Sequence, residues 1–123
     1  MDDEVSRWSI IAARAADDKQ GRATLVIDVG DVLAITDQFV ITSASNTRQV
    51  ATIAQEIEER ISVEGGPKPL RIEGLDDVHW VLLDYGSFVV HVFLEETRSY
   101  YELERLWADV PRLEWRPAGS EAR

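Results

Sequence analysis

The chain has 123 residues, of which 45% are hydrophobic and 29% charged, with no cysteine and a formal net charge of −10. This length and composition predict one globular domain, and the lack of cysteine excludes disulfides, thiolate metal sites and a cysteine nucleophile. The acidic start and the lack of an apolar run of about 20 residues argue against a secretory signal or a membrane span, so a cytoplasmic location is expected.

Three elements are predicted before residue 45. Apolar residues at helical spacing predict an amphipathic helix that ends before Gly21. These residues are Val5, Trp8, Ile11, Ala12 and Ala15. The runs TLVIDV (24–29) and QFVITS (38–43) are short, apolar and rich in β-branched residues, which is typical of strands.

A second helix is predicted after Asn46. Asn46 with Gln49 three residues later resembles a capping box, in which each side chain satisfies a free N–H at the start of a helix. One apolar stripe follows, made of Val50, Ile53, Ala54, Ile57 and Ile61. The Gly65-Gly66-Pro67 sequence ends the helix.

A short strand and a hairpin come next. Residues 69–73 are predicted to form a strand near a sheet edge, because proline supplies no N–H to a ladder. Residues 78–84 and 88–94 then form a hairpin around an Asp-Tyr-Gly-Ser turn. A two-residue loop would pair residues whose numbers sum to 171, so that Trp80 would lie opposite His91.

Alternation along the hairpin divides its side chains into two faces. One face carries His79, Val81, Leu83, Phe88, Val90, Val92 and Leu94, and apart from His79 at its end it is apolar enough to be predicted as core. The mixed face carries Val78, Trp80, Leu82, Asp84, Ser87, Val89, His91 and Phe93. A core does not need the polar residues of the mixed face, so that face is the candidate functional surface.

The carboxyl-terminal part is predicted to contain one more helix. Ser99 with Glu102 suggests a capping box for a closing helix whose inner residues are Leu103, Leu106 and Trp107. The fold class is therefore α/β, a single domain with a mixed sheet of about five strands and flanking helices. The domain is expected to span residues 1–110, and residues 111–123 are expected to form a loosely ordered tail.

The distribution of charged residues indicates which class of partner the chain can bind. Between residues 73 and 109 there are nine carboxylates and two arginines, which gives this segment a net charge of −7. Nucleic-acid binding relies on Lys and Arg at phosphates, so neither direct sequence-specific nucleic-acid binding nor a membrane partner is expected. A basic protein partner is favoured, although an acidic surface can also serve solubility alone.

Catalysis is the weaker interpretation. Asp28, Asp31 and Asp37 are the candidates for a metal-dependent nucleotidyl or phosphoryl transferase, but no Gly-Ser turn introduces a paired Asp-x-Asp strand. His91 is more often a packed structural histidine than a base in such a setting. The glycines do not match a phosphate-binding loop. No catalytic residue, metal site or cofactor is expected.

The mixed hairpin face and the acidic segment after it favour binding. Trp80 is the candidate anchor, because interface hot spots are enriched in buried aromatic residues. Each motif residue also has a structural interpretation: Trp80 can be covered by a helix, Asp84 can begin the turn, and Arg98 can pair with Glu95 or Glu102. A dimeric scaffold stays a third possibility.

The same residues resemble a known family, the ribosomal silencing factors (RsfS, related to plant Iojap). The resemblance covers roughly residues 25 to 108. It rests on Trp-Val-Leu-Leu-Asp-Tyr-Gly (80–86), Val-Val-His-Val-Phe (89–93), Glu95, Arg98, Tyr101-Glu102-Leu103-Glu104 with Leu106-Trp107, and Asp37-Gln38-Phe39-Val40-Ile41.

The resemblance implies a fold similar to the nucleotidyltransferases and a non-enzymatic translation repressor. Such a factor would bind large-subunit ribosomal protein uL14 and sterically block subunit joining when nutrients are limiting. The motif residues that the resemblance implies are Trp80, Asp84, Gly86, His91, Arg98, Tyr101 and Glu104. The acidic residues Glu95, Glu96 and Glu104 are expected to meet Lys or Arg of the partner, because rim charges speed encounter and set register. The motif does not separate residues that touch the partner from residues that hold the platform. A homodimer is also expected, through the hairpin faces or the helix that carries Trp8.

Overall fold

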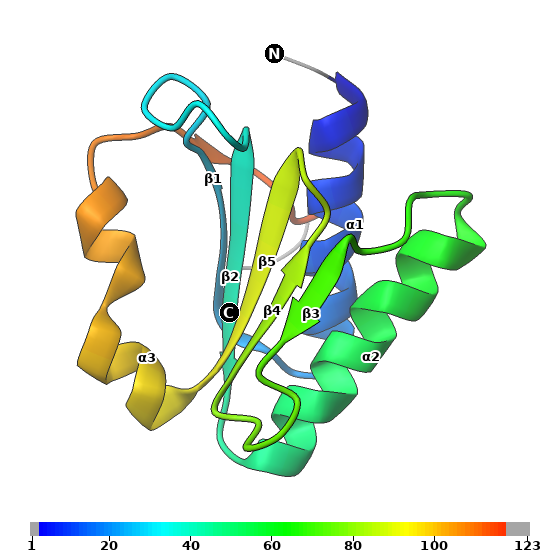
Figure 1. Cartoon of the computed structure of the whole chain (residues 1–123), viewed down its shortest axis with the longest axis vertical. Helices are drawn as coiled ribbons and strands as arrows, with labels where there is room; N and C mark the ends of the chain where they lie inside the picture. Colours follow the sequence, from blue (N-terminus) through cyan, green and yellow to red (C-terminus); the bar gives the residue numbers. More distant parts are fainter. Residues whose placement is uncertain (1–2, 118–123) are drawn as a thin grey trace.

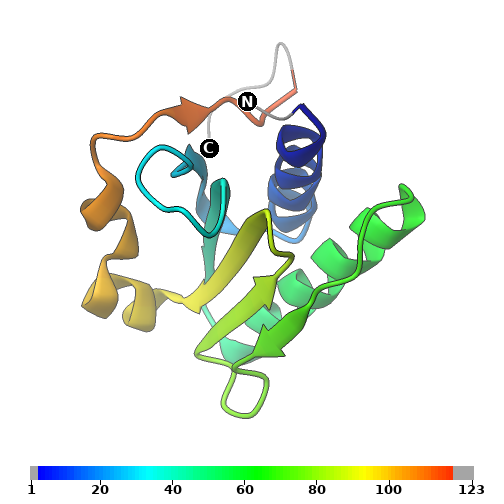
Figure 2. The same cartoon turned by 45° about the horizontal axis from the view of Figure 1, so that its top comes forward.

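Three layers make up the computed structural model, which describes residues 3–117 (Figure 1). A sheet lies in the middle, α1 and α2 cover one face, and α3 with a short 3-10 helix (η1) lies on the other (Figure 2). The elements are α1 (Asp3–Asp18), β1 (Arg22–Asp28), β2 (Gln38–Ala44), α2 (Thr47–Val63), β3 (Arg71–Glu73), β4 (Trp80–Asp84), β5 (Phe88–Leu94), α3 (Glu95–Tyr101), η1 (Leu103–Trp107) and β6 (Arg112–Leu113).

The sheet is mixed, in the order β3-β4-β5-β2-β1-β6. Strands β2 and β5 are parallel, and all other neighbouring strands are antiparallel. The predicted α/β single domain is therefore confirmed, with six strands where about five were expected. Strand β3 lies at the edge of the sheet, as the proline before it predicted. Among residues 3–117, no helix has the length and apolar character needed to cross a membrane.

Helix α2 forms as its sequence predicts. The Asn46 side chain accepts a hydrogen bond from the Gln49 N–H at 2.8 Å, and the Gln49 side chain reaches back to the N–H of Ser45 at 3.1 Å. The return bond thus goes one residue earlier than in a standard capping box. All five apolar residues of the stripe are buried.

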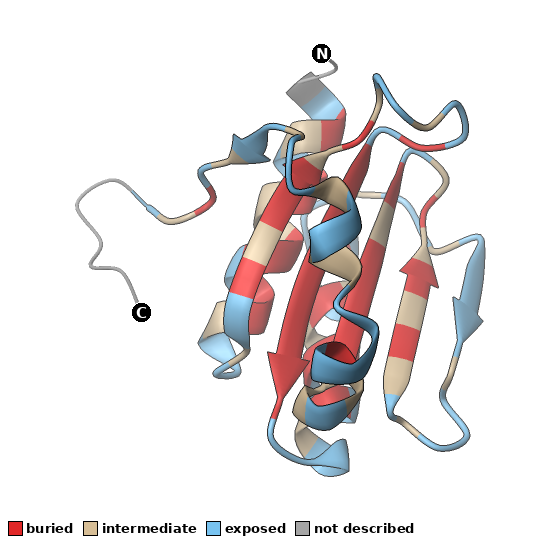
Figure 3. Cartoon of the chain, turned by 90° about the vertical axis from the view of Figure 1, so that its left-hand side faces the viewer, coloured by how far each residue is buried: buried red, intermediate tan, exposed pale blue. Residues whose placement is uncertain are grey.

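Two hydrophobic clusters occupy the two faces of the sheet. The larger cluster joins α1 and α2 to the core face of the hairpin, where Val81, Leu83, Phe88, Val90 and Val92 are fully buried. The smaller cluster lies on the other face, around Ile27, Val29, Phe39, Ile41 and Phe93. Strand β2 is buried along its whole length because both faces are covered there, whereas β4 alternates and β3 is exposed (Figure 3).

The hairpin register differs from the prediction. Trp80 pairs with Phe93, Leu82 with His91, and Asp84 with Val89, so the paired numbers sum to 173 and Trp80 does not lie directly opposite His91. Four residues (85–88) connect the last pair, Asp84 and Val89, where a two-residue loop was predicted. Because the shift is by an even number, the paired side chains keep their predicted faces.

The two residues before β4 depart from that alternation. Val78 adopts a positive φ of 60° and packs against the larger cluster, although it was predicted to lie on the mixed face. His79, the polar residue at the end of the face predicted to be core, is exposed.

The closing helix differs from the prediction as well. Helix α3 begins at Glu95, directly after β5, and ends where Glu102 adopts a left-handed conformation with φ of 47°. The capping box predicted for Ser99 and Glu102 is therefore wrong. Leu103 and Trp107 pack against the smaller cluster as expected, but Leu106 is 72% exposed.

Part of the segment expected to be a loose tail is packed against the domain. Arg112–Leu113 pair with β1, and Trp115 is only 4% exposed. The Trp115 indole N–H donates to the Thr24 carbonyl at 3.0 Å, and Arg14 donates to the Trp115 carbonyl at 2.7 Å. Residues 118–123 of the expected tail lie outside the described residues.

The contacts of Trp115 predict a large effect of its removal. Trp115→Ala should lower the free energy of unfolding by about 3 kcal/mol, because it leaves a cavity and an unpaired carbonyl. Urea denaturation followed by circular dichroism measures this change. The exposed neighbour is the control: Glu114→Ala should change stability by less than about 0.5 kcal/mol. Equal stability of the two variants would contradict the packed position of Trp115.

Candidate functional site

The candidate site lies on the mixed face of the hairpin, where one tryptophan is held by three elements. We call this surface the Trp80 face; it comprises Trp80, Leu82, Asp84, Val89, His91 and Phe93. The Trp80 indole is half-buried and lies 4.7 Å from the Phe93 ring and 5.1 Å from the Tyr101 ring, between centroids. Strand β4 therefore supplies the indole, β5 supports it, and α3 covers one side.

A hydrogen bond to His91 fixes the orientation of this indole. The Trp80 Nε1–H donates to His91 Nδ1 at 3.1 Å. His91 is 5% exposed, and burial lowers its pKa to about 4, so the ring is neutral at pH 7. Because Nδ1 accepts, the ring proton is assigned to Nε2. His91 is thus a buried acceptor that positions Trp80.

A second buried group, Arg98, fastens α3 to the sheet. Arg98 is 7% exposed, and its guanidinium donates to the carbonyls of Arg22 and Ala23 at 3.1 and 2.8 Å. It also donates to Ser43 Oγ at 3.0 Å and to Glu104 Oε2 at 3.1 Å. Arg98 therefore holds the whole segment 95–107, which we call the α3–η1 arm, over the ends of β1 and β2.

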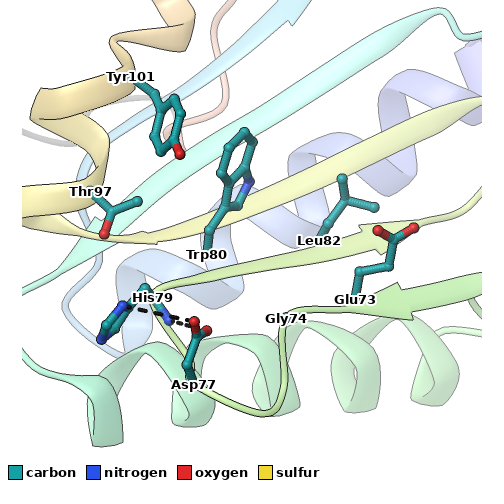
Figure 4. A pocket seen from close by; sticks show the side chains of 8 residues that line it. All are labelled: Glu73, Gly74, Asp77, His79, Trp80, Leu82, Thr97 and Tyr101. Carbon is teal, nitrogen blue, oxygen red and sulfur yellow. Dashed lines mark hydrogen bonds and ion pairs between the residues drawn. The ribbon is translucent and has the colours of Figure 1, made fainter.

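An open cavity of about 540 Å³ lies beside Trp80. Trp80 and Tyr101 form its aromatic wall, and Glu73 and Asp77 provide carboxylates on the other side (Figure 4). We call it the Trp80 cavity. An aromatic wall facing carboxylates suits a cationic side chain that carries an apolar stem.

The acidic residues predicted to meet a partner differ in their availability. Glu95 forms an ion pair with Arg22 at 2.8 Å, and Glu104 pairs with Arg98. Glu96 is exposed and forms no ion pair within residues 3–117. Of the three, Glu96 is therefore the most available to a partner.

Asp84 closes the opposite end of the Trp80 face. It accepts hydrogen bonds from the Gly86 N–H at 2.8 Å and from Arg71 at 2.9 Å. Partial burial acts to raise the pKa of Asp84, but the Gly86 N–H and Arg71 outweigh that effect, so its pKa is lowered. Asp84 is ionised at neutral pH and orders the hairpin turn.

The structure brings together Trp80, His91 and Tyr101 from the predicted set. His91 and Arg98 make internal contacts and present almost no surface, whereas Tyr101 is 55% exposed. Sequence reasoning missed Glu73 and Asp77. The glycine between them, Gly74, is the sequence feature that could have pointed to this segment. Its φ is +90°, and a side chain there would collide with the Trp80 carbonyl, so the chain passes close to Trp80 at this point.

The carboxylates considered for catalysis lie elsewhere. Asp28, Asp31 and Asp37 line a separate cavity with Gln38, and the Asp28 carboxylate accepts from the Gly30 N–H at 3.0 Å. Within residues 3–117, no group of three or more His, Cys, Asp or Glu side chains has an arrangement able to hold a metal ion.

Comparison with known proteins identifies relatives along the chain. The family model "Ribosomal silencing factor during starvation" matches residues 2–123. A Bacillus subtilis ribosomal silencing factor RsfS is 43% identical over 101 residues, which cover 82% of this chain and 85% of that protein. Its counterpart in Halalkalibacterium halodurans is 38% identical over 104 residues, covering 85% and 88%. A crystal structure of a Chromobacterium violaceum protein superposes with a TM-score of 0.80 at 29% identity, covering 88% of each chain.

The burial of His91 predicts how stability depends on pH. Its pKa in the folded chain, about 4, is below the ordinary value of 6.5. The folded state therefore binds the proton less readily, and its stability should be full above pH 6.5 and fall by up to about 3 kcal/mol as the pH drops to 4. His91→Asn should remove this part of the pH dependence, as measured by urea denaturation at several pH values. An unchanged pH dependence in His91→Asn would contradict this origin.

The contacts of Arg98 predict that lysine cannot replace it. Arg98→Lys loses the fork that reaches four acceptors and should lower the free energy of unfolding by about 2–3 kcal/mol. Hydrogen exchange of the α3–η1 arm should rise at the same time. Arg105→Lys is the matched control, because its side chain is 76% exposed. An unchanged exchange rate in Arg98→Lys would show that the arm is held by other contacts.

Proposed function

The chain belongs to the family of ribosomal silencing factors, and we propose that it represses translation by binding the large ribosomal subunit through ribosomal protein uL14. Bound there, it would sterically block the joining of the small subunit when nutrients are limiting. The observation that supports this proposal best is the Trp80 cavity, where a fixed indole and an exposed tyrosine face carboxylates on a rigid sheet. Such a surface has the anchor and the charged rim of a protein interface.

The geometry around Trp80 favours binding over catalysis. His91 is neutral and buried, and its Nδ1 already accepts a bond from Trp80, so this nitrogen is not free to take a proton from a substrate. A hydrolase or transferase built on this histidine would lack its base. A non-enzymatic factor needs only the surface, since steric occlusion involves no chemical step.

The charge of the surface favours a basic partner. The chain carries a net charge of −10, and the Trp80 cavity has carboxylates at Glu73 and Asp77. Glu96 is exposed on α3, next in sequence to Thr97, which lines the cavity. Rim charges of one sign speed the encounter with a partner of the opposite sign, and salt screens them. Binding should therefore weaken as the ionic strength rises.

Residues of the predicted set divide into three roles in this proposal. Trp80, Tyr101 and Glu96 touch the partner directly. His91 and Arg98 act as positioning residues, since the first orients the indole and the second holds the α3–η1 arm. Asp84, Glu95 and Glu104 support the edges through ion pairs with Arg71, Arg22 and Arg98.

Self-association is also proposed, with the Trp80 face as the contact surface. Trp8 lies in α1 and is only 6% exposed, so it does not present a contact surface in the free chain. If two copies meet through the face that binds the partner, the dimer must dissociate before docking. Sedimentation with and without the ribosomal protein distinguishes this competition from a dimer formed elsewhere.

Two adjacent tyrosines provide a matched test of the proposal. Tyr101→Ala should weaken binding to purified uL14 by at least about tenfold, because it removes one wall of the Trp80 cavity. Tyr100→Ala should bind as the original chain does, since Tyr100 is 81% exposed and does not line the cavity. Calorimetry measures both affinities, and light scattering of mixed subunits reports joining.

Three results would contradict or change this proposal, and each can be told from the others. If the unaltered chain does not bind uL14, or binds without slowing subunit joining, the proposal fails. If instead magnesium and a nucleotide bind tightly in calorimetry, the alternative of a metal-dependent transferase at Asp28, Asp31 and Asp37 is supported. Equal loss of affinity in both tyrosine variants would place the contact on the outer side of α3.

A further inference from the structure

The Trp80 face continues past the α3–η1 arm into a second cavity. In the arm, Leu103 and Trp107 pack against the smaller hydrophobic cluster and cover that part of the sheet. Toward the turn between β4 and β5, a cavity of about 400 Å³ opens beside His91. We call it the His91 cavity. Leu82 lines both cavities, so they adjoin on one surface.

Exposed apolar side chains border this second cavity. Ile35 is 85% exposed and Leu70 is 72% exposed, although both are large and hydrophobic. They come from two separate connections, before β2 and before β3, yet both line the cavity with Leu82 and Val89. Apolar residues from separate segments that gather at one hollow mark an interaction surface.

Two buried polar atoms define the chemistry of the occupant. His91 Nε2 and Thr36 Oγ1 have no hydrogen-bond partner within residues 3–117, and both residues line the His91 cavity. His91 Nε2 carries the ring proton and is a donor, while a hydroxyl can accept as well as donate. A peptide group offers a matching acceptor and donor, whereas a hydrocarbon chain would leave both atoms unpaired.

We propose that the His91 cavity is a second docking subsite, which takes an apolar side chain of the protein partner together with the adjoining peptide group. This inference rests on the proposed function, because a partner seated on Trp80 reaches the second cavity across Leu82. His91 Nε2 and Thr36 Oγ1 are covered in the free chain, so the partner displaces side chains at the rim. Ile35 and Leu70 are exposed and can move without opening the core.

Charge at the rim tests the subsite. Ile35→Glu and Leu70→Glu should each weaken binding to uL14 by at least about tenfold, because they place a carboxylate where an apolar side chain must enter. Melting temperatures should stay near that of the unaltered chain, since both positions are exposed. Val63→Glu is the control: Val63 is 77% exposed at the end of α2, on the opposite side of the sheet, and its variant should bind normally.

Removal of the Thr36 hydroxyl tests whether the cavity binds a peptide group. Thr36→Val keeps the shape of the side chain and removes an oxygen that has no hydrogen-bond partner among residues 3–117, so stability should not fall. Affinity for uL14 should decrease about fivefold if the hydroxyl binds the peptide group. An unchanged affinity would overturn the assignment of a peptide group to this cavity.

The outcomes separate this inference from the proposed function. If the unaltered chain binds uL14 and the Ile35 and Leu70 variants bind equally well, the second subsite is overturned and the proposed function stands. If the unaltered chain does not bind, both fail. If the two variants retain partner affinity but convert a dimer into monomers in sedimentation, the occupant is a second copy of the chain, and the proposal is overturned.

Discussion

The buried guanidinium of Arg98 is the constraint on which the candidate docking surface depends. A buried charge is tolerated only when its donors are satisfied. Arg98 meets this requirement with two main-chain carbonyls, one hydroxyl and one carboxylate. The two carbonyls belong to Arg22 and Ala23, where the pairing of β1 with β2 shifts register and Ala23 adopts a positive φ of 49°. An irregularity in β1 thus provides acceptors that a regular ladder would occupy.

Because Arg98 fixes the α3–η1 arm, it also fixes the place of Tyr101 beside Trp80. The indole then has two independent restraints: the Tyr101 and Phe93 rings limit its tilt, and His91 limits its rotation through one hydrogen bond. A surface tryptophan without such restraints would lose conformational freedom when a partner binds. The polar residues His91 and Arg98 therefore serve to hold the Trp80 indole in place before a partner binds.

Local sequence patterns predicted most helices and strands of this fold, but few of the long-range contacts that fix the candidate site. The stripe of α2 and the alternation of β4 and β5 are short-range patterns, and the even register error left Trp80 and His91 on one face. The capping motif at Ser99 was misleading, because α3 starts directly where β5 ends and Glu102 breaks the helix. Arg98 binds residues 55 to 76 positions away, so no local pattern reveals its role. The same holds for Trp115, which reaches Thr24 across 91 positions.

The number of carboxylates in a segment is a poor guide to the charge that a partner meets. Glu95, Glu104 and Asp84 are each paired with an arginine of the same chain, and such pairs present little net charge. The carboxylates of Asp77 and Glu96 lack an arginine partner within residues 3–117. The carboxylate of Glu73 lies 3.8 Å from Arg71, and such an exposed pair is a weak interaction. Two of these three line the Trp80 cavity from β3 and the loop before β4. The negative charge at the candidate docking surface therefore comes largely from the cavity wall opposite Trp80, and less from α3, whose sequence first suggested an acidic surface.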